Sequence, residues 1–70
     1  MRTKEIYNQD QTKLVYINRE LFTDGYNYYV TLLVLNVEHN IYFIDDRHKQ
    51  AGTITSYKNA IQYANNILNN

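Results

Sequence analysis

The run of residues 28–37, Tyr-Tyr-Val-Thr-Leu-Leu-Val-Leu-Asn-Val, is the feature that most constrains the fold of this chain. β-Branched and aromatic side chains fill most of it, which is typical of a β-strand. Polar residues interrupt it at Thr31 and Asn36, and it is too short to span a bilayer as a helix. A strand needs partners, so the rest of the chain is expected to supply neighbours for this one.

A second β-prone segment, residues 13–22, precedes the run and is joined to it through Asp24-Gly25. This dipeptide favours the positive φ angles of a tight type I′ hairpin. Placing Thr23 opposite Tyr26 fixes a register, and the register decides which side chains share a face. One face is then almost entirely apolar. It holds Val15, Ile17, Arg19 and Leu21 from the first strand and Tyr28, Val30, Leu32 and Val34 from the second.

A second turn is expected at residues 38–40, followed by a returning strand at residues 41–46. A slip of one residue in this turn would exchange the faces of Tyr42 and Phe43, and the sequence leaves that register open. Residues 3–7, ahead of a polar turn, and residues 51–54 are candidates for two further short strands.

The last segment, residues 56–68, has the apolar spacing i, i+3, i+4, i+7, i+10, i+11 that predicts one stripe of an α-helix. Thr55 or Ser56 can cap its first turn. The stripe consists of Tyr57, Ala60, Ile61, Ala64, Ile67 and Leu68. Its two alanines allow a close approach to the sheet. We therefore predict an α+β fold, in which a small antiparallel β-meander of three to five strands carries one C-terminal α-helix on one face.

One helix of about four turns, roughly 20 Å long, can cover only one face of such a sheet. The second face is therefore expected to be exposed, unless the N-terminal strand or curling of the sheet covers part of it. Exposed apolar patches of this kind usually mark interfaces, and aromatic residues dominate interface hot spots. The predicted partner-binding residues are Leu14, Tyr16, Tyr29, Leu33, Leu35 and Tyr42, with Phe22 or Phe43 beside them.

Composition agrees with an interaction protein. The chain of 70 residues has no cysteine, so no disulfide or thiolate metal site can stabilise a core that is small for its surface. An oligomer, such as a homodimer, would supply the missing burial. The first five residues are not directly followed by the apolar region of a signal peptide, so we expect no secretory signal. We also expect no membrane association. Asparagine, tyrosine and isoleucine are abundant, which suggests an AT-rich coding sequence. Together with the small size, this composition suggests a phage or mobile-element protein in the cytoplasm of a bacterial host.

Catalytic and metal-binding patterns are few. His39 and His48 lack a second ligand at metal-binding spacing, and an exposed loop histidine is the simpler interpretation. Asp45 and Asp46 could form a general acid/base group or a weak divalent-metal site with His48, but adjacent strand residues point to opposite faces. With Gly25 and Gly52 alone, no phosphate loop can form. We predict no enzyme activity, no cofactor and no metal.

Two functions remain from these observations. The first is a non-enzymatic protein–protein interaction module that associates through its sheet, acting as an inhibitor that docks on a host enzyme complex. The alternative is a nucleic-acid-binding accessory domain that uses the sheet face. Its candidate contacts are Arg19, Arg47, His48 and Lys49. The equal numbers of basic and acidic residues, seven of each, weigh against this alternative because phosphate contacts need a basic stripe.

Overall fold

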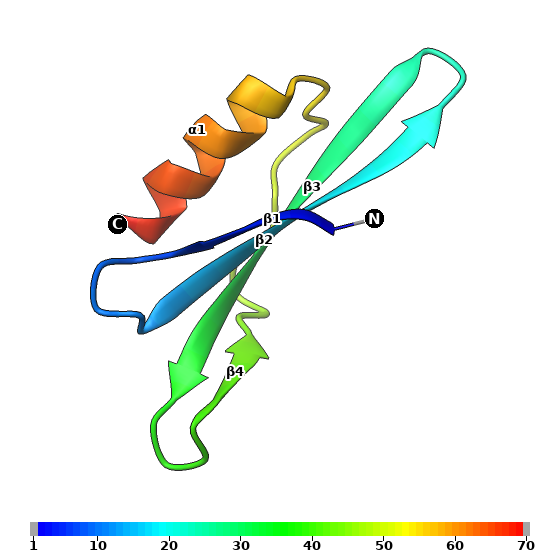
Figure 1. Ribbon diagram of the computed structural model, residues 1–70. Coiled ribbons are helices and arrows are strands. Elements are labelled where there is room, and N and C mark those ends of the chain that lie inside the picture. Colours follow the sequence, from blue (N-terminus) through cyan, green and yellow to red (C-terminus); the bar gives the residue numbers. More distant parts are fainter. Residues whose placement is uncertain (1, 70) are drawn as a thin grey trace.

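The computed structural model describes residues 2–69 and contains a four-stranded antiparallel sheet with strand order β1-β2-β3-β4 (Figure 1). A single helix, α1, follows the described strands and packs against the sheet. The bounds are β1 (Arg2–Tyr7), β2 (Lys13–Phe22), β3 (Gly25–Asn36), β4 (Ile41–Ile44) and α1 (Tyr57–Leu68). Each strand pairs with the next one in the chain, so the predicted α+β meander with a C-terminal helix is confirmed.

The register between β2 and β3 differs from the predicted one by two residues. Phe22 pairs with Gly25, so Thr23 and Asp24 form the turn and Gly25 is already part of β3. Gly25 has a φ of 127°, whereas neither turn residue has a positive φ, so the predicted type I′ turn is wrong. A slip of two residues returns every side chain to its face, and the predicted division of faces therefore survives. Ile17, for example, lies opposite Val30 instead of Leu32.

The main core lies between the sheet and α1. Val15 and Ile17 of β2 and Ala60 and Ala64 of α1 are completely buried in it. Because alanine has a short side chain, the helix axis can approach the strands closely at these two positions. The remaining buried members of the cluster are Tyr28, Val30, Leu32 and Leu68. The helix thus covers the face that the sequence assigned to it.

Helix α1 begins after Ser56, whose Oγ accepts a hydrogen bond from the backbone N–H of Asn59 at 3.3 Å. This bond identifies Ser56, and not Thr55, as the N-cap. The exposed side of the helix carries the polar residues expected there, Lys58, Asn59, Gln62, Asn65 and Asn66.

The loop between β4 and α1 covers the edge of β3 that β4 leaves open. Gln50 accepts a hydrogen bond from the Val30 N–H through Oε1 at 2.8 Å and donates one from Nε2 to the Tyr28 carbonyl at 3.2 Å. Ile54 forms an isolated bridge with Tyr28, which is all that remains of the predicted strand at residues 51–54. The returning strand also ends earlier than predicted, at Ile44, so Asp45 and Asp46 belong to this loop.

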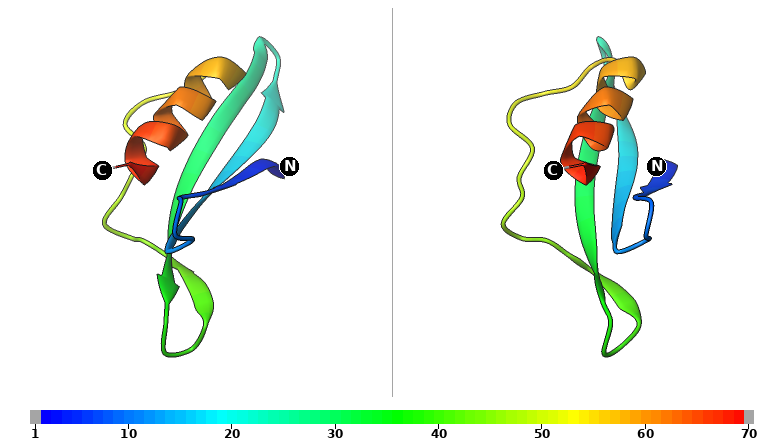
Figure 2. Two further views of the ribbon diagram at one scale, coloured as in Figure 1. Left: turned by 60° about the vertical axis from the view of Figure 1, so that its left-hand side comes forward. Right: turned by 90° about the vertical axis from the view of Figure 1, so that its left-hand side faces the viewer.

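The molecule is elongated, with extents of 43 × 20 × 19 Å. Helix α1 has 12 residues and is therefore about 18 Å long, less than half of the long dimension. Figure 2 shows that the β2–β3 turn and the β3–β4 hairpin project beyond the two ends of the helix. Both ends of the sheet consequently lack helical cover. Within residues 2–69, no helix has the length and apolar character needed to cross a membrane.

Candidate interaction surface

The face of the sheet opposite α1 is partly closed, contrary to expectation. Leu14 and Leu33 lie opposite each other on β2 and β3 and are only 2% and 6% exposed. Neither residue belongs to the helix-side cluster, so together they form a second small core on the other face. The expectation that these two side chains would be exposed is therefore wrong.

Two tyrosines from the outer strands cover this second core. The rings of Tyr7 on β1 and Tyr42 on β4 meet edge to face, with centroids 5.8 Å apart. Because β2 and β3 lie between these strands, both rings must lean inward across the face that carries Leu14 and Leu33. The Tyr42 hydroxyl also donates a hydrogen bond to the Gln11 carbonyl at 2.5 Å. The sheet therefore curls at the end that carries Leu14 and Leu33, which is one of the alternatives that the sequence left open.

The β1–β2 turn holds the Gln11 carbonyl in place for this contact. Asn8 Oδ1 accepts a hydrogen bond from the Lys13 N–H at 2.9 Å, and Asp10 Oδ1 accepts one from the Thr12 hydroxyl at 2.7 Å. The Thr12 hydrogen bonds lower the pKa of the Asp10 carboxyl. Burial of Tyr42, together with the nearby Tyr7, raises the pKa of the Tyr42 hydroxyl. We call the two buried leucines and the two tyrosines that cover them, Leu14, Leu33, Tyr7 and Tyr42, the closed end.

The other predicted partner-binding residues are unevenly accessible. Tyr29 is exposed, whereas Tyr16, Leu35 and Tyr42 are half-buried. Tyr29 lies toward the β2–β3 turn, away from the closed end. The predicted site is therefore divided between a buried part and an exposed part, and the role of its members in partner binding stays a prediction.

The β2–β3 turn carries the first exposed apolar surface. Leu21 is 67% exposed, and it pairs with Tyr26 on the helix side of the sheet. Phe22 and Tyr29 project from the opposite face. The Arg19 guanidinium lies 4.5 Å from the centroid of the Tyr26 ring, where the aromatic face attracts the cation. We call the four residues Leu21, Phe22, Tyr26 and Tyr29 the tip surface.

Sequence reasoning missed half of the tip surface. It assigned Leu21 to the face under the helix, and it did not single out Tyr26. The relative lengths of the helix and the strand could have revealed it. Helix α1 and strand β3 have 12 residues each, but a strand rises about twice as much per residue as a helix. A helix of equal residue count cannot cover the whole strand.

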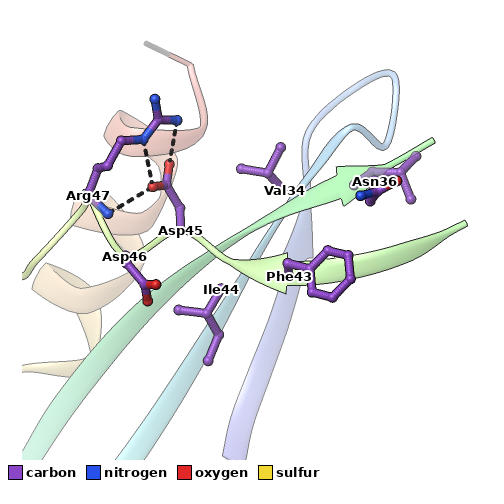
Figure 3. Close-up of a pocket in the computed structure, with 8 residues that line it drawn as sticks. Val34, Asn36, Phe43, Ile44, Asp45, Asp46 and Arg47 are labelled. Carbon is purple, nitrogen blue, oxygen red and sulfur yellow. Dashed lines mark hydrogen bonds and ion pairs between the residues drawn. The ribbon is translucent and has the colours of Figure 1, made fainter. Parts of the chain in front are cut away.

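The β3–β4 hairpin carries the second exposed apolar surface. Phe43 and Ile44 are 49% and 62% exposed, and Val37 and Ile41 are also exposed. Phe43 and Ile44 line a shallow depression of about 420 Å³ together with Val34 and the charged segment that follows β4 (Figure 3). We call Val37, Ile41, Phe43 and Ile44 the β4 surface.

Beside this depression, Arg47 folds back onto Asp45. The Arg47 Nε lies 3.2 Å from Oδ1 of Asp45, and the Arg47 backbone N–H donates to the same oxygen at 3.0 Å. Figure 3 shows the Asp46 carboxylate pointing away from this pair, so the two adjacent carboxylates do not converge. Among residues 2–69, no group of three His, Cys, Asp or Glu side chains could hold a metal ion.

Hydrogen bonds from the Arg47 side chain lower the pKa of the Asp45 carboxyl below its ordinary value of 3.8. A carboxyl with a lowered pKa in the folded state stabilises it at pH values above 3.8, and this contribution is lost as the pH falls through the lowered pKa. An NMR titration of the Asp45 side-chain carbon should give a pKa below 3.8, moving upward in Arg47→Gln. An unchanged titration in Arg47→Gln would contradict this assignment.

The four residues proposed for nucleic-acid binding are not gathered into one basic stripe. Arg19 lies on β2 against Tyr26, whereas the others belong to the loop after β4. Arg47 is paired with Asp45, and His48 Nε2 is 3.0 Å from the Tyr63 hydroxyl on α1. Lys49 is exposed. Three of the four side chains thus have a partner within the chain, and their role with nucleic acid stays a prediction.

Comparison of the chain with protein-family models, with curated proteins and with solved structures gives no match. Function is therefore inferred from the geometry of its own residues.

Proposed function

We propose that this protein is a non-enzymatic protein–protein interaction module that docks its tip surface on a larger partner. The observation that carries the proposal is the position of three exposed apolar side chains, Leu21, Phe22 and Tyr26, where the β2–β3 hairpin extends past α1. Tyr29 adds a fourth on the face away from the helix, beside the buried Tyr28. The four residues are one leucine and three aromatic side chains on both faces of one narrow hairpin end. A projection of this form can enter a groove on another protein.

The tip surface has properties of an interface hot spot. Aromatic side chains supply a large contact area at a small cost in conformational entropy, and they are enriched at the centres of interfaces. Arg19, stacked on Tyr26, adds a residue type that is also frequent in hot spots. The strands behind the tip continue into both cores, so the hairpin is held by the folded body. These features support docking of a preformed surface.

In a small phage or mobile-element protein, such docking would inhibit a host enzyme complex in the bacterial cytoplasm. Self-association through the sheet is part of the same proposal, because the β4 surface is also apolar and exposed and lies at the opposite end of β3 from the tip surface. The two surfaces are well separated along the molecule, so one can bind a partner while the other binds a second copy.

Capture of host proteins from a lysate by the immobilised chain tests this proposal when variants are compared. Leu21→Lys should reduce capture of the specific partner at least tenfold, because a hot-spot substitution costs about 2 kcal/mol or more. The matched control is Gln62→Lys, which adds the same charge on the exposed side of α1 and should leave capture unchanged. Equal capture by unmodified chain and Leu21→Lys, with both folded, would contradict docking through the tip.

A further inference from the structure

We propose that two copies of this chain associate by antiparallel pairing of their β4 strands around a twofold axis that passes between the two Phe43 residues. The two sheets then form one continuous sheet of eight strands, twice the four of a single chain. This inference rests on the self-association within the proposed function and specifies it, because it names the strand that pairs, the register of the pairing and a second copy of the chain as the partner. It does not depend on the partner that the tip surface binds.

Among the described sheet edges, that of β4 is the least protected. The outer strand β1 carries Lys4 and Glu5 and has an irregular register between Arg2 and Lys4, two devices that discourage edge pairing. The edge of β3 is covered by the Gln50 side chain and by the Ile54 bridge. In contrast, β4 is Ile-Tyr-Phe-Ile, with high β-propensity and without charge, proline or bulge.

The hydrogen-bond pattern indicates which backbone groups of β4 are available. The Asp45 N–H donates to the Leu32 carbonyl, and hydrogen-bonded pairs alternate with non-bonded ones along an antiparallel ladder. Phe43 therefore directs its N–H and C=O toward β3. The same alternation directs the N–H and C=O groups of Tyr42 and Ile44 outward, along the free edge.

One symmetric register uses all of these outward groups. A twofold axis perpendicular to the sheet keeps each side chain on its own face, so each β4 residue must meet a partner of the same parity. With the axis at Phe43, Tyr42 of each copy forms a hydrogen-bonded pair with Ile44 of the other. The Phe43 residues then face each other as a non-bonded pair, with Cα atoms about 4.5 Å apart.

The side chains fit this register. Phe43 is half exposed and meets an identical ring on the helix side, while Tyr42 meets an isoleucine on the other side. Aromatic–aromatic and aromatic–β-branched cross-strand pairs are both favourable. A net charge of zero adds no overall repulsion between copies.

Single-cysteine variants can read the register directly because the chain contains no cysteine. Phe43→Cys should form a disulfide-linked dimer under mild oxidation, since the predicted Cα separation lies within the range that a disulfide bridges. Ile41→Cys and Ile44→Cys are matched controls on the same strand, and each would cross-link only in a slipped register. Leu21→Cys reports pairing through the tip surface instead. We expect cross-linking of Phe43→Cys to exceed that of the three others at least tenfold.

A second variant tests the edge without a new thiol. Ile44→Pro removes an outward N–H and places the proline ring at the free edge, a position where an edge strand tolerates proline. It should shift the chain to monomer in sedimentation while its circular dichroism stays that of the folded protein. Ile44→Val is the control and should keep the dimer.

The outcomes separate this inference from the proposed function. Preferential cross-linking at Leu21→Cys, Ile41→Cys or Ile44→Cys, or a dimer that survives Ile44→Pro, would overturn the proposed pairing. A strict monomer of the unmodified chain at high micromolar concentration would overturn it as well. Cross-linking at Ile41→Cys or Ile44→Cys, a dimer that survives Ile44→Pro, or a strict monomer would leave docking through the tip surface unaffected. Preferential cross-linking at Leu21→Cys would also place the tip surface in the self-contact, and the capture experiment with Leu21→Lys tests its docking on a partner separately.

Discussion

Leu33→Lys is expected to lower the free energy of unfolding by about 3–5 kcal/mol. Leu33 is 6% exposed within the closed end, where a lysine ammonium would have no acidic partner opposite Leu14. An uncompensated buried charge costs about 3–5 kcal/mol. The total stability expected for a chain of 70 residues is roughly 4–10 kcal/mol, so this single substitution removes much of it.

Tyr29→Lys is the matched control for this substitution. Tyr29 lies on the same face of the same strand, but its side chain is exposed, so the change in unfolding free energy should stay within about 0.5–1 kcal/mol. Urea unfolding followed by circular dichroism measures both variants. Similar urea midpoints for Leu33→Lys and Tyr29→Lys would contradict the burial of Leu33 in the closed end.

Ala64→Leu is expected to weaken the packing of α1 on the sheet. Ala64 has no exposed surface, and the helix approaches β2 and β3 closely at this position. The added carbons must displace the helix or force strained rotamers, which costs about 1–3 kcal/mol and occasionally more. A loss of 2 kcal/mol would lower the melting temperature by about 8–16 °C in a domain of this size.

Asn65→Leu provides the control on the next residue of the same helix. Asn65 is exposed, so the same side chain there replaces a polar residue on the solvated side and should not alter packing. Leucine also has a better helix propensity than asparagine, which makes a small gain in stability the expected sign. If Ala64→Leu melted at or above the temperature of Asn65→Leu, the close approach of α1 would be contradicted.

The helix and its docking face could be predicted from the sequence because local patterns determine them. The 3.6-residue stripe identified α1, and the alanines at positions 60 and 64 are buried against the strands as expected. The face of β3 under the helix was also predicted correctly, although the hairpin register was not. Since side chains alternate along a strand, a two-residue error in register leaves this face unchanged.

The closed end could not be predicted in the same way, because it depends on a contact between the first and last strands of the sheet. Tyr7 and Tyr42 are 35 residues apart in the chain, and neither shows a local sign of the other. Their contact follows from curling of the whole sheet, which no short pattern encodes. The burial of Leu14 and Leu33 is a consequence of that curling, whereas the exposure of Leu21 and Tyr26 at the other end follows from the short length of α1.

The most direct test of the proposed interaction module is sedimentation velocity with fluorescence detection. The chain is labelled through a Gln62→Cys substitution on the exposed side of α1. In buffer at micromolar concentration, the labelled chain should sediment as a concentration-dependent mixture of monomer and dimer. In a bacterial lysate, a faster component should appear that excess unlabelled chain displaces. A single monomer boundary in both solutions would contradict the proposal that this protein acts by binding other chains.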